Sequence, residues 1–245
     1  WRRGAALAGG LVLLLGLTSG LGRGGLTGGG VGLALGAVWS VSAALGLPTH
    51  QVAVIMAVAC VILLSLLLRL ALMFSGLTVL DDHRSSGESV ARSDVLTSVA
   101  GAHRSLVIAT VAIAVAAATA GIGLATGFDW WTGGLSVVLA LVVASRSRLF
   151  PLTAQKAVLI AASLVVLVAF LWSLTDTVAW GVWPALGIAT AIAAIPAVVL
   201  SIEQPEHVRA RLRGVANRFE AIAVVVMVPL AIGAFGTFQR LLTTF

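Results

Sequence analysis

The sequence predicts an all-α fold: a polytopic transmembrane helical bundle of about eight spans. Of the 245 residues, 60% are hydrophobic and 10% are charged, whereas a soluble domain carries about 25% charged residues to solvate its surface. Apolar stretches of about 20 residues, the length a helix needs to cross a bilayer, recur along the chain. The 27 glycines let helices approach closely in lipid. This composition excludes a soluble enzyme domain, a disordered chain and a coiled coil.

The apolar stretches define the domain organisation. Three spans are expected in residues 1–76, four in 105–202 and one in 220–245, with polar loops at 77–104 and 203–219 between these groups. The eight predicted spans cover 4–22, 25–47, 51–76, 105–127, 131–146, 155–174, 178–202 and 220–241. The second is rich in glycine, and the fifth is short for a complete crossing.

The distribution of basic residues predicts the orientation. With eight spans, eleven of the fifteen Lys and Arg residues fall on the side of three polar connections, at 77–104, 146–154 and 203–219. The positive-inside rule places that side in the cytoplasm and the C-terminus outside. The net charge of +6 therefore reports orientation and does not indicate nucleic-acid binding. A seven-span arrangement, in which residues 4–47 cross fewer times, fits the charges equally well. Eight is preferred because 25–47 contains no charge and is long enough to span.

Tryptophans gather beside the turns on the opposite side. Two short turns contain Asp129 and Asp176. The tryptophans close to them are Trp130, Trp131, Trp172, Trp180 and Trp183. Trp is enriched at membrane interfaces because its ring is amphipathic. The cluster therefore predicts an aromatic belt at the outer face.

A ladder of small residues is the most specific packing signal. It consists of Gly24, Gly28, Gly32, Gly36 and Ser40, each four residues from the next. Residues at this spacing share one face of a helix, and small-residue faces let transmembrane helices pack closely. The ladder predicts either a contact with a neighbouring span of the same chain, a contact between subunits, or a groove for a lipid chain.

Arg69 is a charge within a predicted span. Such charges are costly and often functional in membranes. Arg69 also lies about two turns before the cytoplasmic end of its span, where a long side chain can extend to the headgroups. Both interpretations remain open: an arginine that reaches the interface, or one with a structural or functional partner.

The sequence contains no recognisable catalytic or metal-binding pattern. It has no phosphate-binding loop and no nucleophile elbow, and its four histidines and Cys60 lack metal-ligand spacing. Asp129, Asp176 and Glu220 are expected at the membrane boundaries, and no acid or histidine is expected deep in a span, where an ion-coupled transporter needs one. We therefore expect no enzyme activity, no metal and no cofactor, although structural lipids are compatible with the ladder.

The two longest polar loops are candidate contact regions. In 77–104, residues 90–103 carry a weak helical apolar face, which predicts a short amphipathic helix at the cytoplasmic surface; the alternative is a solvated connector. The 203–219 loop ends in basic residues that suit anionic headgroups or an acidic partner surface. The residues expected to make such partner or headgroup contacts are Arg84, Arg92, Asp94, Arg209, Arg211 and Arg213.

Several segments resemble one known family. RARLR at 209–213, ANRFEAIA at 216–223, VPLAIG at 228–233, SRSRLFP at 145–151 and VAR at 90–92, together with the spacing of the spans, resemble EccD. EccD is the polytopic inner-membrane component of actinobacterial type VII (ESX) secretion systems. The resemblance covers essentially the whole chain, as a pattern of loops and spans rather than a catalytic signature.

The resemblance implies a fold, partners and a location. EccD proteins have a cytoplasmic ubiquitin-like domain followed by eleven spans and an outside C-terminus, so the eight spans here correspond to the last eight. Two EccD copies surround a lipid-filled vestibule and scaffold a complex with EccB, the ATPase EccC and EccE. For this chain it implies a non-catalytic, multi-pass scaffold in the bacterial inner membrane. The alternative function is a stand-alone solute permease or channel, which requires a polar path through the bundle.

Overall fold

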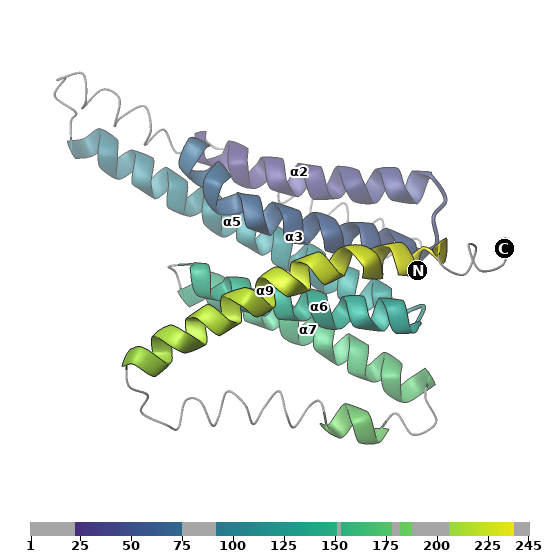
Figure 1. Cartoon of the computed structure of the whole chain (residues 1–245). Coiled ribbons are helices and arrows are strands. Elements are labelled where there is room, and N and C mark those ends of the chain that lie inside the picture. The colour runs from purple at the N-terminus through teal and green to yellow at the C-terminus, as the bar shows by residue number, and fades with distance from the viewer. Residues whose placement is uncertain (1–22, 75–91, 151–152, 178–181, 188–205, 238–245) are drawn as a thin grey trace.

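Long helices build the molecule. The computed structural model describes residues 23–74, 92–150, 153–177, 182–187 and 206–237, and all regular structure within these ranges is helical (Figure 1). The long helices are α2 (Arg23–Ala44), α3 (Thr49–Phe74), α5 (Arg92–Ala125), α6 (Trp130–Arg146), α7 (Thr153–Thr177) and α9 (Glu206–Ala234). A 3₁₀ turn, η1 (Ser147–Leu149), follows α6, and residues 182–187 form a short helix.

Each long helix overlaps a predicted span. In the described residues, three stretches are long and apolar enough to cross a membrane: Thr49–Leu67, Leu106–Ala125 and Thr153–Thr177. Gly29–Ala44 and Trp130–Arg146 are shorter apolar helices, as expected for the fifth predicted span. The predicted span at 4–22, and 178–202 apart from 182–187, lie outside the described residues. The helical membrane fold is thus confirmed, while the number of eight spans and the orientation stay predictions.

Two helices extend into segments that the sequence assigned to loops. Helix α5 begins at Arg92 and continues through the expected boundary at 104–105, and α9 begins at Glu206 and continues through 219–220. Neither extension contains a proline, the residue that most strongly interrupts a helix. The expected amphipathic segment therefore forms the first turns of α5 instead of a separate helix, and most of the 203–219 loop is helical.

From α2 to α7 the long helices run in alternate directions between two ends of the bundle, and α9 runs in the same direction as α7 (Figure 1). One end contains the loop between α2 and α3, the turn between α5 and α6, and the last turn of α7; because Trp130 and Trp172 lie there, we call it the tryptophan end. The other contains the end of α6 and the start of α7, and we call it the arginine end after Arg146 and Arg148. The tryptophan end is on the right in Figure 1.

Helix α5 is the central element of the bundle. It contacts α2, α3, α6 and α7, while α6 packs against both α7 and α9. The buried face of α5 is composed largely of alanines: Ala109, Ala112, Ala114, Ala116, Ala117 and Ala120. Small side chains bring helix backbones close together, so van der Waals contact can replace the hydrophobic driving force that is missing in lipid.

Glycines mark the closest approaches between helices. A Cβ placed on Gly121 of α5 would lie 2.6 Å from a methyl carbon of Val166 on α7, and one on Gly123 would lie 2.8 Å from Ala53 on α3. At Gly233 of α9, a Cβ would fall within 2.5 Å of the Trp131 ring on α6. These three contacts fix how α3, α7 and α9 fit against their neighbours.

Candidate functional site

The structure separates the members of the glycine ladder. Gly32 and Gly36 are buried within the chain. Ser40, at the same spacing, is exposed, and its hydroxyl donates to the Gly36 carbonyl at 2.8 Å. Gly24 and Gly28 belong to α2, but their packing lies outside the described part of the chain. Along α2, the residues of the ladder therefore change from buried to exposed toward the tryptophan end.

Six of the other predicted residues lie near the ends of helices. Arg69 lies in the last two turns of α3. Arg92 and Asp94 lie in the first turn of α5, and Arg209, Arg211 and Arg213 lie in the first turns of α9. The side chains of these residues lie outside the described part of the structure, as does Arg84 entirely.

An ion pair joins two basic segments at the arginine end. The Arg146 Nε lies 2.6 Å from the Glu220 carboxylate, and the Ser145 hydroxyl donates to the other Glu220 oxygen at 2.8 Å. The side chains of Arg146 and Glu220 are 21% and 13% exposed. The pair connects the end of α6 to the middle of α9. Arg146 and Glu220, which are far apart in sequence, therefore lie at the same level along the bundle. Sequence reasoning placed both near the cytoplasmic boundary without pairing them.

A groove of about 1120 Å³ opens at the tryptophan end. It is lined by α3, α5 and α7, at Pro48, Thr49, His50, Ile122, Ala125, Thr126, Phe128, Leu164, Val165, Val168, Ala169, Trp172, Ser173, Asp176 and Thr177. Small residues form its floor, since Ala125 and Ala169 are half-buried and Ser173 is buried. The larger apolar residues on its walls are open to the surroundings: Ile122 is 42% exposed and Val168 is 62% exposed.

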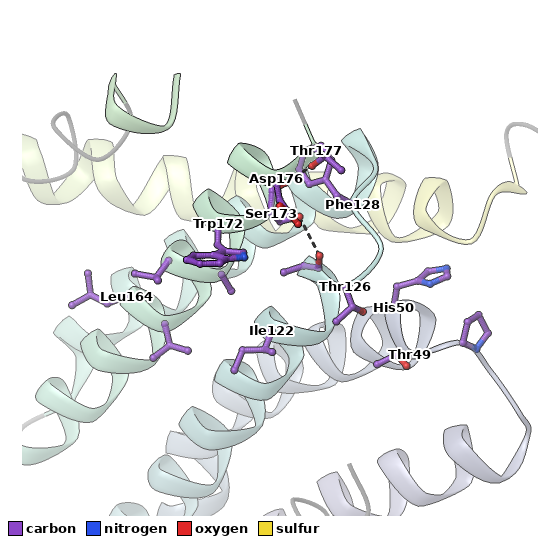
Figure 2. A pocket seen from close by; sticks show the side chains of 15 residues that line it. Thr49, His50, Ile122, Thr126, Phe128, Leu164, Trp172, Ser173, Asp176 and Thr177 are labelled. Atoms are coloured by element: carbon purple, nitrogen blue, oxygen red, sulfur yellow. Dashed lines mark hydrogen bonds between the residues drawn. The ribbon is translucent and has the colours of Figure 1, made fainter. Parts of the chain in front are cut away.

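Polar groups are confined to one end of this groove. Figure 2 shows Leu164 at one end of the α7 wall and Asp176 at the other, with His50 and Thr126 near the polar end. The hydroxyl of Thr126 donates to the Gly123 carbonyl at 2.7 Å, and that of Ser173 donates to the Ala125 carbonyl at 3.1 Å. The groove is therefore an apolar trough with a polar rim, which we call the rim groove.

The turn between α5 and α6 shapes one side of this region. Asp129 caps α6: its Oδ1 accepts a hydrogen bond from the Trp130 amide at 2.8 Å, and the Thr132 hydroxyl accepts one from the Asp129 amide at 2.9 Å. Asp129 therefore has a local structural role at this turn. Beside it, a Cβ on Gly127 would lie 3.2 Å from the His50 ring, so the glycine makes room for that histidine.

His50 lies between two cavities. Besides the rim groove, it lines a smaller polar cavity of about 290 Å³, together with Asp129, Thr132 and residues of the α9 end. The sequence placed Asp129 and Asp176 at the outer membrane boundary and considered His50 only as one of four histidines without metal-ligand spacing. The fold gathers all three at the tryptophan end, which the sequence indicated only through the tryptophans near two turns. No group of three His, Cys, Asp or Glu side chains in the described ranges is arranged to hold a metal ion.

The fold and these features define the class of protein: an integral membrane protein made of packed, largely apolar helices. The EccD-like transmembrane domain family matches residues 3–244, nearly the whole chain, and the chain belongs to this family. The resemblance found in the sequence is thereby confirmed. Membership makes the chain a type VII secretion-related membrane component, of the kind that works with other subunits. A comparison with curated proteins found no match.

Proposed function

We propose that this chain is a non-catalytic scaffold subunit of a type VII (ESX) secretion complex in the bacterial inner membrane. In this function it pairs with a second copy around a lipid-filled vestibule. It also binds the EccB, EccC and EccE subunits through its cytoplasmic segments, and EccC supplies the energy. Family membership across residues 3–244 is the observation that carries the proposal.

The polar groups inside the bundle support a scaffold over a permease. The buried hydroxyls of Thr110, Ser136 and Ser163 each hydrogen bond to a backbone carbonyl, at 2.6 to 2.9 Å. Such groups are satisfied locally and offer no chain of sites for a solute or ion. In the described helices, side chains that carry a charge occur toward the two ends, which leaves the middle of the bundle apolar.

The experiment is the size and composition of the complex extracted from the membrane in mild detergent. A scaffold predicts a large assembly that retains an ATPase subunit. A small homo-oligomer that is stabilised by a solute would contradict the scaffold function and support a stand-alone permease or channel, because a ligand stabilises the state to which it binds.

A second experiment tests pairing through the ladder without damaging the fold. Ser40→Leu alters an exposed member of the ladder, whereas Gly32 is buried in the chain and its replacement would also disturb internal packing. If the ladder continues into a contact between subunits, Ser40→Leu lowers the dimer fraction and leaves the unfolding temperature unchanged. Ala34→Leu, at another exposed position of α2, is the matched control. An unaffected dimer would place the contact elsewhere.

A further inference from the structure

We infer that the rim groove is a binding site for one phospholipid with a primary ammonium headgroup, of the phosphatidylethanolamine type. The apolar trough takes an acyl chain, and the rim formed by Thr49, His50, Thr126, Asp176 and Thr177 holds the headgroup. This site lies within a single chain, so the inference does not depend on the proposed pairing or on partner subunits.

The length of the groove fits one leaflet of a bilayer. The α7 wall extends from Leu164 to Thr177, and a helix rises 1.5 Å per residue, so the wall is about 20 Å long. A bilayer with its headgroups is about 40 to 45 Å thick, which makes one leaflet about 20 to 22 Å. A transmembrane helix from a partner would need a groove through the whole hydrocarbon core. The rim groove therefore matches a lipid better than a helix.

The groove is apolar along most of its length and polar at its rim, just as a phospholipid has apolar acyl chains and a polar headgroup. Leu164, Val165 and Val168 line the deep part, and the ionisable residues lie at the rim. Trp172, beside the rim, is 74% exposed, as suits a ring at the level of the headgroups. An exposed apolar trough is stable in lipid because an acyl chain can fill it, and the volume of this one, about 1120 Å³, slightly exceeds the usual range of ligand pockets.

The charges at the rim select the headgroup. Asp176 attracts an ammonium group and repels the net negative charge of an anionic lipid. The hydroxyls of Thr126 and Thr177 donate to the backbone carbonyls of Gly123 and Ser173, so their oxygens remain available to accept hydrogen bonds from an ammonium. A quaternary choline group cannot donate these bonds, so the rim favours a primary ammonium.

The phosphate of such a lipid has its own donors on the α3 side of the rim. Helix α3 begins at Thr49; its Gln51 and Val52 amides donate to the Pro48 carbonyl, which leaves the Thr49 and His50 amides as helix-end donors that can attract an anion. The His50 ring carries an N–H group in any protonation state, and within the described chain neither this ring nor Asp176 has a hydrogen-bond or ion-pair partner. The rim thus presents an acid to the ammonium and donors to the phosphate.

The test is native mass spectrometry of the whole chain released from nanodiscs that contain equal amounts of phosphatidylethanolamine, phosphatidylglycerol and phosphatidylcholine with the same acyl chains. We expect one retained lipid per chain, with phosphatidylethanolamine retained about tenfold over phosphatidylglycerol, the ratio that one charge-assisted contact provides. Equal or greater retention of either other lipid would overturn the inference.

Two pairs of variants locate the site. Asp176→Asn should lower the headgroup preference about tenfold, while Asp129→Asn, which removes a charge at the same end and keeps a capping side chain, should preserve it. Ala169→Trp fills the floor of the groove and should remove the retained lipid. Ala157→Trp, at an exposed position of α7 outside the groove, should not.

Each variant also has an outcome that counts against the site. Unchanged lipid retention in Ala169→Trp, or an unchanged preference in Asp176→Asn, would place the lipid elsewhere. Because Asp176 is exposed, its replacement leaves the fold intact even if the tryptophan variant does not fold. The readout uses the isolated chain, so its failure leaves the scaffold function standing, and loss of the complex would leave the lipid result standing.

Discussion

Adjacent residues near the end of α5 face opposite surroundings. Gly121 packs against Val166 and Gly123 packs against Ala53, and neither contact leaves space for a methyl group. Ile122, between the two glycines, is 42% exposed and lines the rim groove. All of these residues are apolar or small, and hydropathy treats them alike. The comparison shows that side-chain size decides which face of a membrane helix closes on its neighbours and which stays open to lipid.

The largest expected effect tests the closed face. Gly121→Leu should destabilise the chain by about 3 kcal/mol or more, because the added side chain meets the stiff, β-branched Val166 and the helices must separate. Unfolding in a denaturing-detergent titration measures the loss. Gly30→Leu is the matched control, since its Cβ meets nothing within 4 Å. Equal stability of the two variants would show that the α5–α7 contact is not close.

A gain of stability is expected where the closed region contains an unpaired polar group. Gln155 at the arginine end is 1% exposed, and neither polar atom of its amide is hydrogen bonded in the described structure. A buried unpaired polar group costs about 1 to 3 kcal/mol. Gln155→Met, which keeps the shape, should therefore raise the free energy of unfolding by about 1 to 2 kcal/mol. A loss of stability would indicate a partner for the amide, such as a bound water.

The ion pair at the arginine end provides the third test. Glu220→Gln should destabilise the chain by about 1 to 2 kcal/mol, because a half-buried Arg146 loses its counter-charge. A double-mutant cycle with Arg146→Met separates the pair from other effects of each change. Additive effects in the cycle would mean that the two charges do not interact and that the ion pair does not hold α6 against α9.

The cap of α6 should contribute less. Asp129→Ala removes the hydrogen bond to the Trp130 amide and should lower the free energy of unfolding by about 1 kcal/mol. Asp129→Asn should retain most of this stability because an asparagine caps equally well. If both variants lose stability to the same extent, the charge of Asp129 matters more than its hydrogen bond.

The smallest effect is expected in the open groove. Ala169→Trp should change stability by no more than about 0.5 kcal/mol, since the added ring enters space that is already open. Thermal unfolding of the delipidated chain measures this. A loss as large as that of Gly121→Leu would mean that the groove closes in the membrane, and the contrast between the two faces of α5 would disappear.

Much of the fold was predictable because hydropathy and length are read directly from the chain. The spans at 25–47, 51–76 and 131–146 correspond to α2, α3 and α6. The helix predicted at 90–103 was not expected to be continuous with the next span, and the helix start at Glu206 was not predicted. Polar helical turns next to a span look like loops when hydropathy is the criterion. The family was also identifiable, since its segments occur along the whole chain.

The candidate site was much less predictable. The sequence emphasised the ladder at Gly32 and Gly36, which turned out to be buried in the chain. It placed Asp176 at the outer boundary and did not connect it with His50, although the two residues line one groove. Residues so far apart in sequence are brought together only by how α3, α5 and α7 pack, and the sequence contains no local pattern that records this.

The sequence by itself determined that this chain is a membrane bundle of a particular family, because the cost of burying polar groups in lipid fixes the composition of every span. Only the tertiary structure decided where the bundle is closed and where it is open. That depends on whether a small residue faces a neighbouring helix, as Gly121 does, or an open groove, as Ala169 does. Packing contacts of this kind act over less than one side-chain length.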